Sequence, residues 1–155
     1  YVESAGGLPG LSAGLSSPAL YIVIGIGGLV GLATAEFEAR IGLAWLMRAI
    51  FAASMLSLLA AAYVPASWPG LGVSGALQGA CIMMQSSIFA FWSDRLFPDL
   101  ASVSLTVVLM FYAAGNVIGP ALAGTAADAW SMQLVFVVSA GLSLATALLF
   151  PARAG

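Results

Sequence analysis

Residues 43–64 read LAWLMRAIFAASMLSLLAAAYV and contain a single charged side chain, that of Arg48. About 20 consecutive apolar residues are enough for a helix to cross the hydrocarbon layer of a bilayer. The run stops at Pro65, and residues 65–70 read PASWPG, a composition typical of a turn at a membrane surface. We therefore predict a transmembrane helix over residues 43–64.

Four more apolar runs flank this one, separated by short polar or proline-containing segments. They cover roughly residues 18–35, 71–92 and 103–126, with a last run that closes near Phe150. Residues 36–42 form a charged connector, and residues 1–17, rich in Gly and Ser, are too broken to span. We predict an all-α polytopic membrane helix bundle of about five transmembrane helices. Residues 1–155 form its single domain, with residues 1–17 as an outer lead-in segment.

The amino-acid composition points to a lipid environment. Hydrophobic residues make up 62% of the 155 residues and charged residues only 6%, whereas about 25% of an ordinary soluble domain is charged. A very apolar soluble bundle is the alternative, but this chain has too little polar surface to cover one.

Several residue types that carry catalytic chemistry are missing from the sequence. It has no His and no Lys, so it offers no imidazole base, no histidine metal or haem ligand and no Schiff-base lysine. Its one cysteine, Cys81, cannot form an intrachain disulfide or a thiolate zinc cage, and four arginines make no basic stripe. We therefore expect no enzyme, no metal, no cofactor and no nucleic-acid partner.

The arginines predict the orientation of the bundle, because positive residues near span ends are retained on the cytoplasmic side. All four fall on one predicted side: Arg40, Arg48, Arg95 and Arg153. Tryptophans mark both predicted surfaces, Trp45 and Trp92 at inner span ends and Trp68 and Trp130 at outer ones. We predict an integral protein of the cytoplasmic (inner) membrane, surrounded by membrane lipid, with its N-terminal segment outside and its C-terminus in the cytoplasm.

Polar side chains recur at helical spacing in the middle of two predicted spans. One helical face of the 71–92 run carries Ser74, Gln78, Cys81 and Gln85. In the 103–126 run, Tyr112 and Asn116 place a phenol and an amide where each needs a partner. We interpret Gln78, Gln85, Tyr112 and Asn116 as candidates to line a solute path. Hydrogen bonding between helices, with no transport role, would explain the same residues.

Small residues and a proline predict close packing and bending. Gly75, Gly79 and Ser86 form a row beside the polar face of the 71–92 run, so another helix can approach there. In the 103–126 run, Pro120 removes a backbone donor and bends a helix, which makes Gly119 and Pro120 a candidate hinge. Close packing alone would also account for the glycines.

The order of these motifs resembles that of the major facilitator superfamily. The resembling segments are a connector that ends Ala39-Arg40-Ile41-Gly42, the pair Gln78-Gly79, and Gly115-Asn116-Val117-Ile118-Gly119-Pro120 followed by Gly124 and Asp128. The resemblance covers nearly all of the chain, and its details look closest to the YbfB-like branch. It implies helices eight to twelve, in the C-terminal half of a twelve-helix transporter.

Two departures from the family pattern help to place the chain. The family connector carries Asp-Arg-x-Gly, but Ala39 stands at the Asp position, with Glu36 and Glu38 as displaced acids. An Arg usually stands three residues before Gln-Gly in the N-terminal half, where this sequence has Gly75. Both departures are commoner in the C-terminal half, and helices two to six of the N-terminal half remain the alternative. Resemblance alone makes Glu36, Glu38 and Arg40 gating candidates.

The resemblance implies part of a secondary active transporter that moves a small solute by alternating access. Its partner would be the missing N-terminal half, because the sequence starts at Tyr1 without an initiator Met and we interpret that start as a cut end. The alternative is a non-transporting membrane scaffold or degenerate transporter module that binds partner helices. An intramembrane enzyme is the least favoured class, because no nucleophile–base pair or metal cluster is visible.

The arginine distribution predicts the outcome of a labelling experiment. Cysteines introduced at Ser67 and Asp99 should react with an impermeant maleimide from opposite sides of sealed vesicles, Ser67→Cys from the outside. If both positions react from the same side, the predicted topology is wrong.

Overall fold

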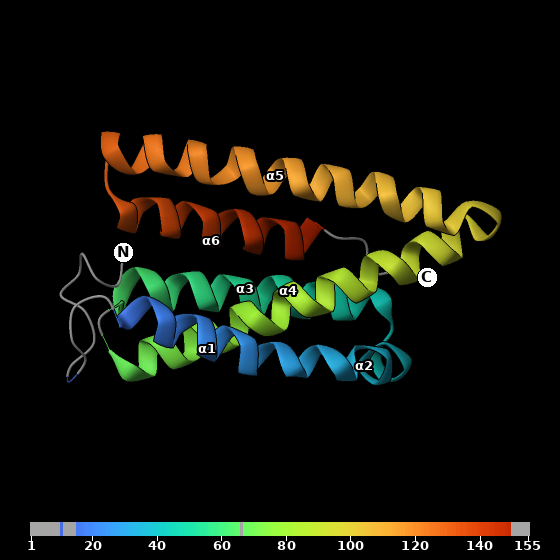
Figure 1. Cartoon of the computed structure of the whole chain (residues 1–155), viewed down its shortest axis with the longest axis horizontal. Helices are drawn as coiled ribbons and strands as arrows, with labels where there is room; N and C mark the ends of the chain where they lie inside the picture. Colours follow the sequence, from blue (N-terminus) through green and yellow to red (C-terminus); the bar gives the residue numbers. More distant parts are fainter. Residues whose placement is uncertain (1–9, 11–14, 66, 150–155) are drawn as a thin grey trace.

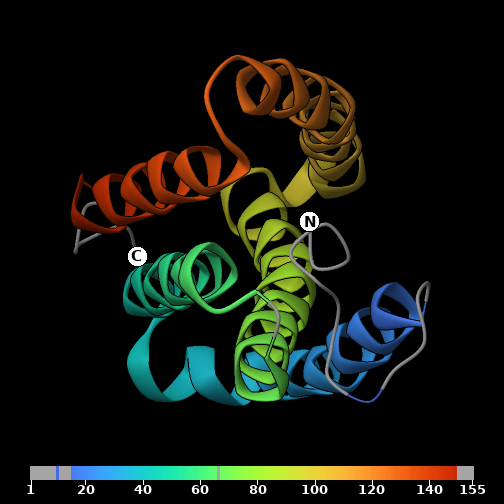
Figure 2. The same cartoon turned by 90° about the vertical axis from the view of Figure 1, so that its left-hand side faces the viewer.

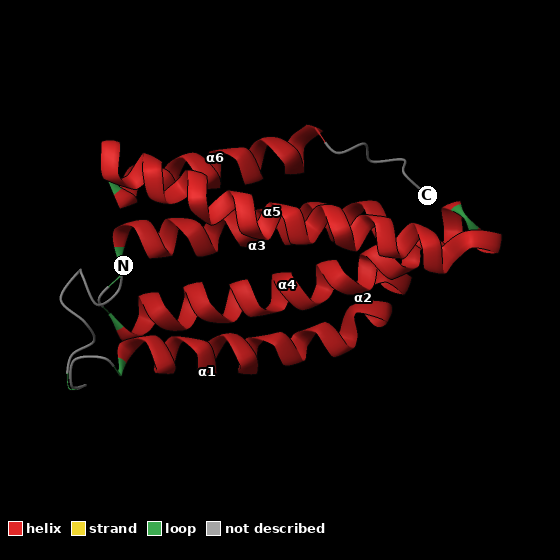
Figure 3. Ribbon diagram, turned by 45° about the horizontal axis from the view of Figure 1, so that its top comes forward, coloured by secondary structure: helices red, strands yellow, loops and turns green. Residues whose placement is uncertain are grey.

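The computed structural model describes residues 10, 15–65 and 67–149 of the chain, and within these ranges it is a bundle of helices without strands (Figures 1 and 3). The elements follow the chain in the order α1 (Ser16–Gly28), η1 (Leu29–Ala33), α2 (Thr34–Ile41), α3 (Leu43–Tyr63), α4 (Trp68–Leu96), η2 (Pro98–Leu100), α5 (Ala101–Ala129) and α6 (Met132–Leu149). The predicted all-α class is confirmed.

The chain passes along the bundle five times, with α1, η1 and α2 together forming the first pass (Figure 1). Four passes are long and apolar enough to cross a membrane: Ser17–Ile41, Leu43–Tyr63, Pro98–Ala129 and Met132–Leu149. These helices are those of a polytopic integral membrane protein. The particular membrane and the orientation in it stay predictions.

The remaining pass, α4, is the longest together with α5 but less apolar, because it carries Gln78 and Gln85 besides several glycines and serines. It starts where α3 ends and leads to the opposite end of the bundle, where α5 begins (Figure 1). If α3 and α5 cross the membrane, α4 must therefore cross it too. This is the fifth of the predicted spans.

The position of α4 explains how it can carry polar residues. It lies in the centre of the bundle and packs against α1, η1, α3 and α5 (Figure 2). A helix that is surrounded by protein need not present an apolar surface to lipid on every side. By contrast, α5 lies at the edge, and none of its residues is buried.

The charged connector predicted over residues 36–42 is helical as far as Ile41, so the first pass extends beyond the predicted end of its span near residue 35. Glu36 and Arg40 form an ion pair one helical turn apart, which supports the helix. The chain turns only at Gly42, whose φ of 78° and ψ of 157° lie in a region that favours glycine. A single residue thus separates α2 from α3.

The turn predicted over residues 65–70 is shorter than expected, because α3 ends at Tyr63 and residues 68–70 already belong to α4; Ala66 lies outside the described residues. A side-chain cap sets where α4 begins. The Ser67 hydroxyl accepts a hydrogen bond from the backbone N–H of Gly70 at 3.0 Å, and Pro69 lies in the first turn. A Cβ atom on Gly70 would lie 1.9 Å from the carbonyl oxygen of Val64, so the turn is close-packed.

The largest apolar core lies between α3 and α4. Ile88 is fully buried at 0% exposure at its centre. The buried members of this core are Leu43, Leu46, Met47, Ile50, Cys81, Met84 and Ile88. The close packing of these side chains favours the α3–α4 contact, because they make denser van der Waals contacts with each other than with water or loosely packed lipid.

Helices α1 and α4 approach so closely that their backbones touch. A Cβ atom on Gly79 would lie 1.9 Å from the carbonyl oxygen of Ile24, and one on Gly27 would lie 2.3 Å from that of Ala76. Gly27 at the end of α1 and Gly31 in η1, like Gly75 and Gly79 on α4, are four residues apart, which is the small-xxx-small pattern of close helix pairs. The predicted packing role of Gly75 and Gly79 is confirmed.

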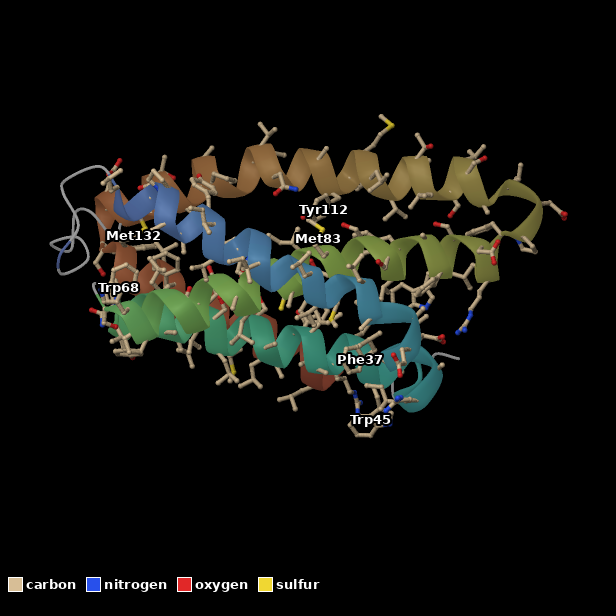
Figure 4. The ribbon with its side chains drawn as sticks, turned by 60° about the horizontal axis from the view of Figure 1, so that its bottom comes forward. Phe37, Trp45, Trp68, Met83, Tyr112 and Met132 are labelled. Carbon is tan, nitrogen blue, oxygen red and sulfur yellow. The ribbon has the colours of Figure 1, made fainter. Side chains whose placement is uncertain are left out.

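The two ends of the bundle differ in charge. The arginines of the described residues, Arg40, Arg48 and Arg95, lie at the end where α2 meets α3 and α4 leads into α5. Trp45 lies at this end and Trp68 at the other (Figure 4). Arg153 falls outside the described residues, as do most of residues 1–17.

The α1–α4 contact predicts an asymmetry between two glycines of α4. Gly79→Ala should lower the free energy of unfolding by about 1–3 kcal/mol, because its methyl group must push the two backbones apart. Unfolding in bicelles, followed by circular dichroism against added denaturing detergent, measures the change.

Gly72→Ala is the matched control, because a Cβ atom there meets nothing within 4 Å. It should be neutral or slightly stabilising, since alanine favours a helix. Equal destabilisation by the two substitutions would contradict the packing of α1 on α4.

Candidate functional site

A cavity of about 390 Å³ lies among the helices, close to the end where α1 begins and α3 turns into α4. Its volume falls in the range of sites that hold small molecules. Residues of α1, α3, α4 and α6 and of the α3–α4 turn line it: Ser17, Leu20, Ile24, Ser57, Leu58, Ala61, Pro65, Gly70, Leu71, Ser74, Gly75, Gln78 and Phe136. Four passes of the chain therefore contribute to one space.

The polar part of the cavity wall is built around Ser57. This α3 residue is only 2% exposed, and its hydroxyl donates to the backbone carbonyl oxygen of Ser74 at 2.9 Å. The Gln78 side-chain oxygen also lies within reach of the hydroxyl, at 3.4 Å. A single proton serves both acceptors, so the shorter bond is the stronger one. The hydroxyl ties α3 to the polar face of α4.

Gln78 is half-buried in the cavity wall, as expected for a residue that lines a solute path. Its side-chain oxygen faces Ser57, which leaves its two amide N–H groups as donors. Its role in binding a solute stays a prediction.

The predicted polar row of α4 is divided along its length. Ser74 and Gln78 line the cavity, but Cys81 is 4% exposed in the α3–α4 core, with its thiol 3.4 Å from the carbonyl oxygen of Ile50. Gln85, one turn further, is half-buried and is not part of the cavity wall. Residues on one helical face thus have different neighbours, since Ser74 and Gln78 line the cavity whereas Cys81 packs in the α3–α4 core.

Tyr112 and Asn116 lie on α5, away from the cavity wall. The Tyr112 ring faces α4 and meets the Phe89 ring edge-on, with 6.0 Å between the ring centres (Figure 4). The Asn116 amide nitrogen donates to the carbonyl oxygen of Tyr112 on its own helix at 2.9 Å. The structure does not bring these two residues together with Gln78, and their place on a solute path stays a prediction.

The predicted hinge lies in a helix that stays unbroken. α5 continues through Gly119 and Pro120 to Ala129. Pro120 lacks an N–H group, so the carbonyl of Asn116, four residues earlier, loses its helical donor. A Cβ atom on Gly115 or Gly119 would meet nothing within 4 Å, so this face of α5 is open. Bending at Pro120 stays a prediction.

Four charged residues at the opposite end form two ion pairs. Arg95, at the end of α4, donates to Glu38 of α2 at 2.6 Å, and Arg40 pairs with Glu36 within α2. The Arg48 guanidinium lies 5.0 Å above the ring of Trp45. The Glu38–Arg95 pair joins α2 to the end of α4. A gating role for Glu36, Glu38 and Arg40 stays a prediction.

Within the described ranges, no three His, Cys, Asp or Glu side chains gather as a metal site would require. No family model, no curated protein and no solved structure matches the chain.

Sequence reasoning did not identify Ser57 as part of the site. A serine in an apolar helix commonly bonds to its own backbone, as Thr106 and Thr146 do here. Only the packing of α3 on α4 reveals that Ser57 bonds across helices. The sequence carries one signal for this bond: the side-chain amide of Gln78 needs a hydrogen-bond partner in an apolar span.

The Ser57 contact predicts a difference between the two serines of α3. Ser57→Ala should lower the free energy of unfolding by about 0.6 kcal/mol, with an upper limit of about 1.7 kcal/mol, because interhelical hydrogen bonds in membranes have this strength. Ser54→Ala, on the same helix, should change it by less. Unfolding of both variants in bicelles measures the difference, and a larger effect at Ser54 would contradict the cluster.

Proposed function

We propose that the chain is part of a secondary active transporter, in which the cavity between α1, α3, α4 and α6 holds a small solute during passage across the membrane. The observation that carries the proposal is the cavity itself, with Ser57 and Gln78 in its wall. A membrane bundle with only a structural task would gain packing energy by filling such a space.

The position of the polar groups supports a binding role. Ser57, Ser74 and Gln78 lie on two helices and meet at the cavity. Binding sites of transporters lie between helices in the membrane interior, where a few polar groups can fix a solute. The apolar remainder of the wall would contact the apolar part of a solute.

The open face of α5 supports a second bundle as partner. The face carries the Asn116 side chain and the backbone carbonyl that Pro120 leaves without a helical donor. Lipid chains cannot bond to these groups, whereas helices of a partner can. Gly115 and Gly119 would let such a helix come close.

The resemblance to the major facilitator superfamily extends this proposal. According to this resemblance, the partner is the N-terminal half of the transporter. The two halves rock about the solute, and the chain supplies helices eight to twelve of the fold.

A non-transporting scaffold is the second candidate, and the open face of α5 also favours it. A scaffold would bind partner helices through Gly115, Asn116 and Gly119, as a transporter half would. The two functions differ at the cavity, which a scaffold does not need. Tests at Gln78 therefore separate them better than tests on α5.

Water access to the cavity is the first expected outcome. In a Cys81→Ala background, Gln78→Cys should react with a small impermeant maleimide, because a thiol reacts as thiolate and needs water to form one. Val73→Cys, exposed on the outer surface of α4, should stay unreactive in lipid, as should the fully buried Ile88→Cys. Equal reactivity at positions 78 and 73 would contradict a water-accessible cavity.

Flux is the second expected outcome. The chain reconstituted alone should give no solute uptake above empty liposomes, because alternating access needs both halves. Reconstituted with its partner half, it should give saturable uptake that Gln78→Leu lowers at least tenfold and that Gln133→Leu, at an exposed position of α6 outside the cavity wall, leaves nearly unchanged. Saturable uptake by the chain alone would refute the two-half arrangement, and unaffected uptake in Gln78→Leu would remove the cavity from the path.

A further inference from the structure

We infer that the cavity takes an uncharged, amphipathic small molecule, with an apolar body and a hydrogen-bond acceptor that Gln78 contacts. The claim that this molecule is a transported solute rests on the proposed function. The claim that it binds in the cavity does not. The inference follows from three properties of the wall: its apolar surface, its lack of charge and the donors it leaves unused.

Most of the wall is apolar. Leu20 and Ile24 contribute from α1, Leu58 from α3, Leu71 from α4 and Phe136 from α6. These side chains form sides of the space on four different helices. A hydrophilic solute such as a sugar, with hydroxyls on every face, would leave most of them unpaired here. An apolar body fits this surface.

None of the described residues that line the cavity is ionisable. Among the described residues, the charged side chains of α2, α4 and η2 and Arg48 lie towards the other end of the bundle, and Asp128 lies near the end of the edge helix α5. Glu36 and Glu38 are also already paired with arginines. A charged ligand would therefore be buried without a counter-charge, which is strongly unfavourable in a membrane interior.

The polar groups of the wall specify what the ligand must offer. The Ser57 hydroxyl already donates towards the Ser74 carbonyl oxygen and the Gln78 side-chain oxygen, so it has little capacity left to donate to a ligand. The Gln78 amide keeps two N–H donors, for which the described residues supply no hydrogen-bond acceptor. A ligand with a carbonyl, ether or hydroxyl oxygen satisfies Gln78. The volume of about 390 Å³ admits a molecule with one or two rings.

Three probes of similar size but different charge test the inference. Acetanilide is neutral with a carbonyl acceptor, phenylacetate is an anion at pH 7, and benzylammonium is a cation. Equilibrium dialysis of each radiolabelled probe against the full chain in nanodiscs, corrected for empty nanodiscs, measures binding. Acetanilide should bind saturably, at one site per chain, and at least tenfold more tightly than either ion.

Variants locate the binding site. Gln78→Leu should weaken acetanilide binding at least tenfold, and Gln85→Leu, on the same helical face but outside the cavity, should leave it unchanged. Ala61→Phe keeps Gln78 and fills the space, so it should abolish binding even if Gln78→Leu folds poorly. Circular dichroism confirms that each variant is folded.

Three outcomes would overturn the inference: no saturable acetanilide binding, equal or tighter binding of an ion, or equal effects at positions 78 and 85. Failure of transport gives a different result. If acetanilide binds as described but vesicles with both halves show no uptake of any solute, the binding inference stands and the proposed transport function falls.

Discussion

Where α1 crosses α4, glycine backbones lie in direct contact, and the rest of the bundle depends on this approach. At Gly27 and Gly79 a single methyl group would overlap a carbonyl oxygen of the opposite helix. Lipid tails are as apolar as leucine, so hydrophobicity alone gives membrane helices little reason to associate. Close backbone packing supplies the missing attraction, and it sets the position of α4 between α1 on one side and α3 on the other.

The central position of α4 links packing to chemistry. Because α1, α3 and α5 surround it, α4 can carry Gln78 in a setting where lipid is not the neighbour (Figure 2). The glycine contact holds α1 against one face, and the core around Ile88 holds α3 against another. Towards the end where α4 begins, the same helices leave a cavity, with Ser57 and Gln78 in its wall. Close contact and cavity are thus consequences of one arrangement.

The hydrophobic runs were enough to predict the helices, because a span must be apolar over about 20 residues and leaves a strong pattern. Residues 43–64 match α3 within one residue at its end. The first span was predicted to end near residue 35, where the apolar run stops, but the helix continues to Ile41, as the Glu36–Arg40 spacing favours. Gly75 and Gly79 were predicted to pack, but their partner on α1 is a tertiary fact that one sequence does not contain.

The candidate site was less predictable for the same reason. Helical spacing placed Ser74, Gln78, Cys81 and Gln85 on one face, but not which neighbour each would meet. Cys81 lies in the core and Gln78 at the cavity, although they are less than one turn apart.

The central claim, that α1 and α4 meet through glycines, is tested most directly by disulfide cross-linking in native vesicles. In a Cys81→Ala background, Gly75→Cys with Val23→Cys should cross-link nearly completely, because a Cβ on Gly75 lies 3.3 Å from that of Val23 and the Cβ atoms of a disulfide lie about 3.5–4.5 Å apart. Gly75→Cys with Gly25→Cys should not, because a Cβ on Gly25 meets nothing within 4 Å. No cross-link in the first pair, or equal cross-linking in both, would contradict the arrangement on which the cavity rests.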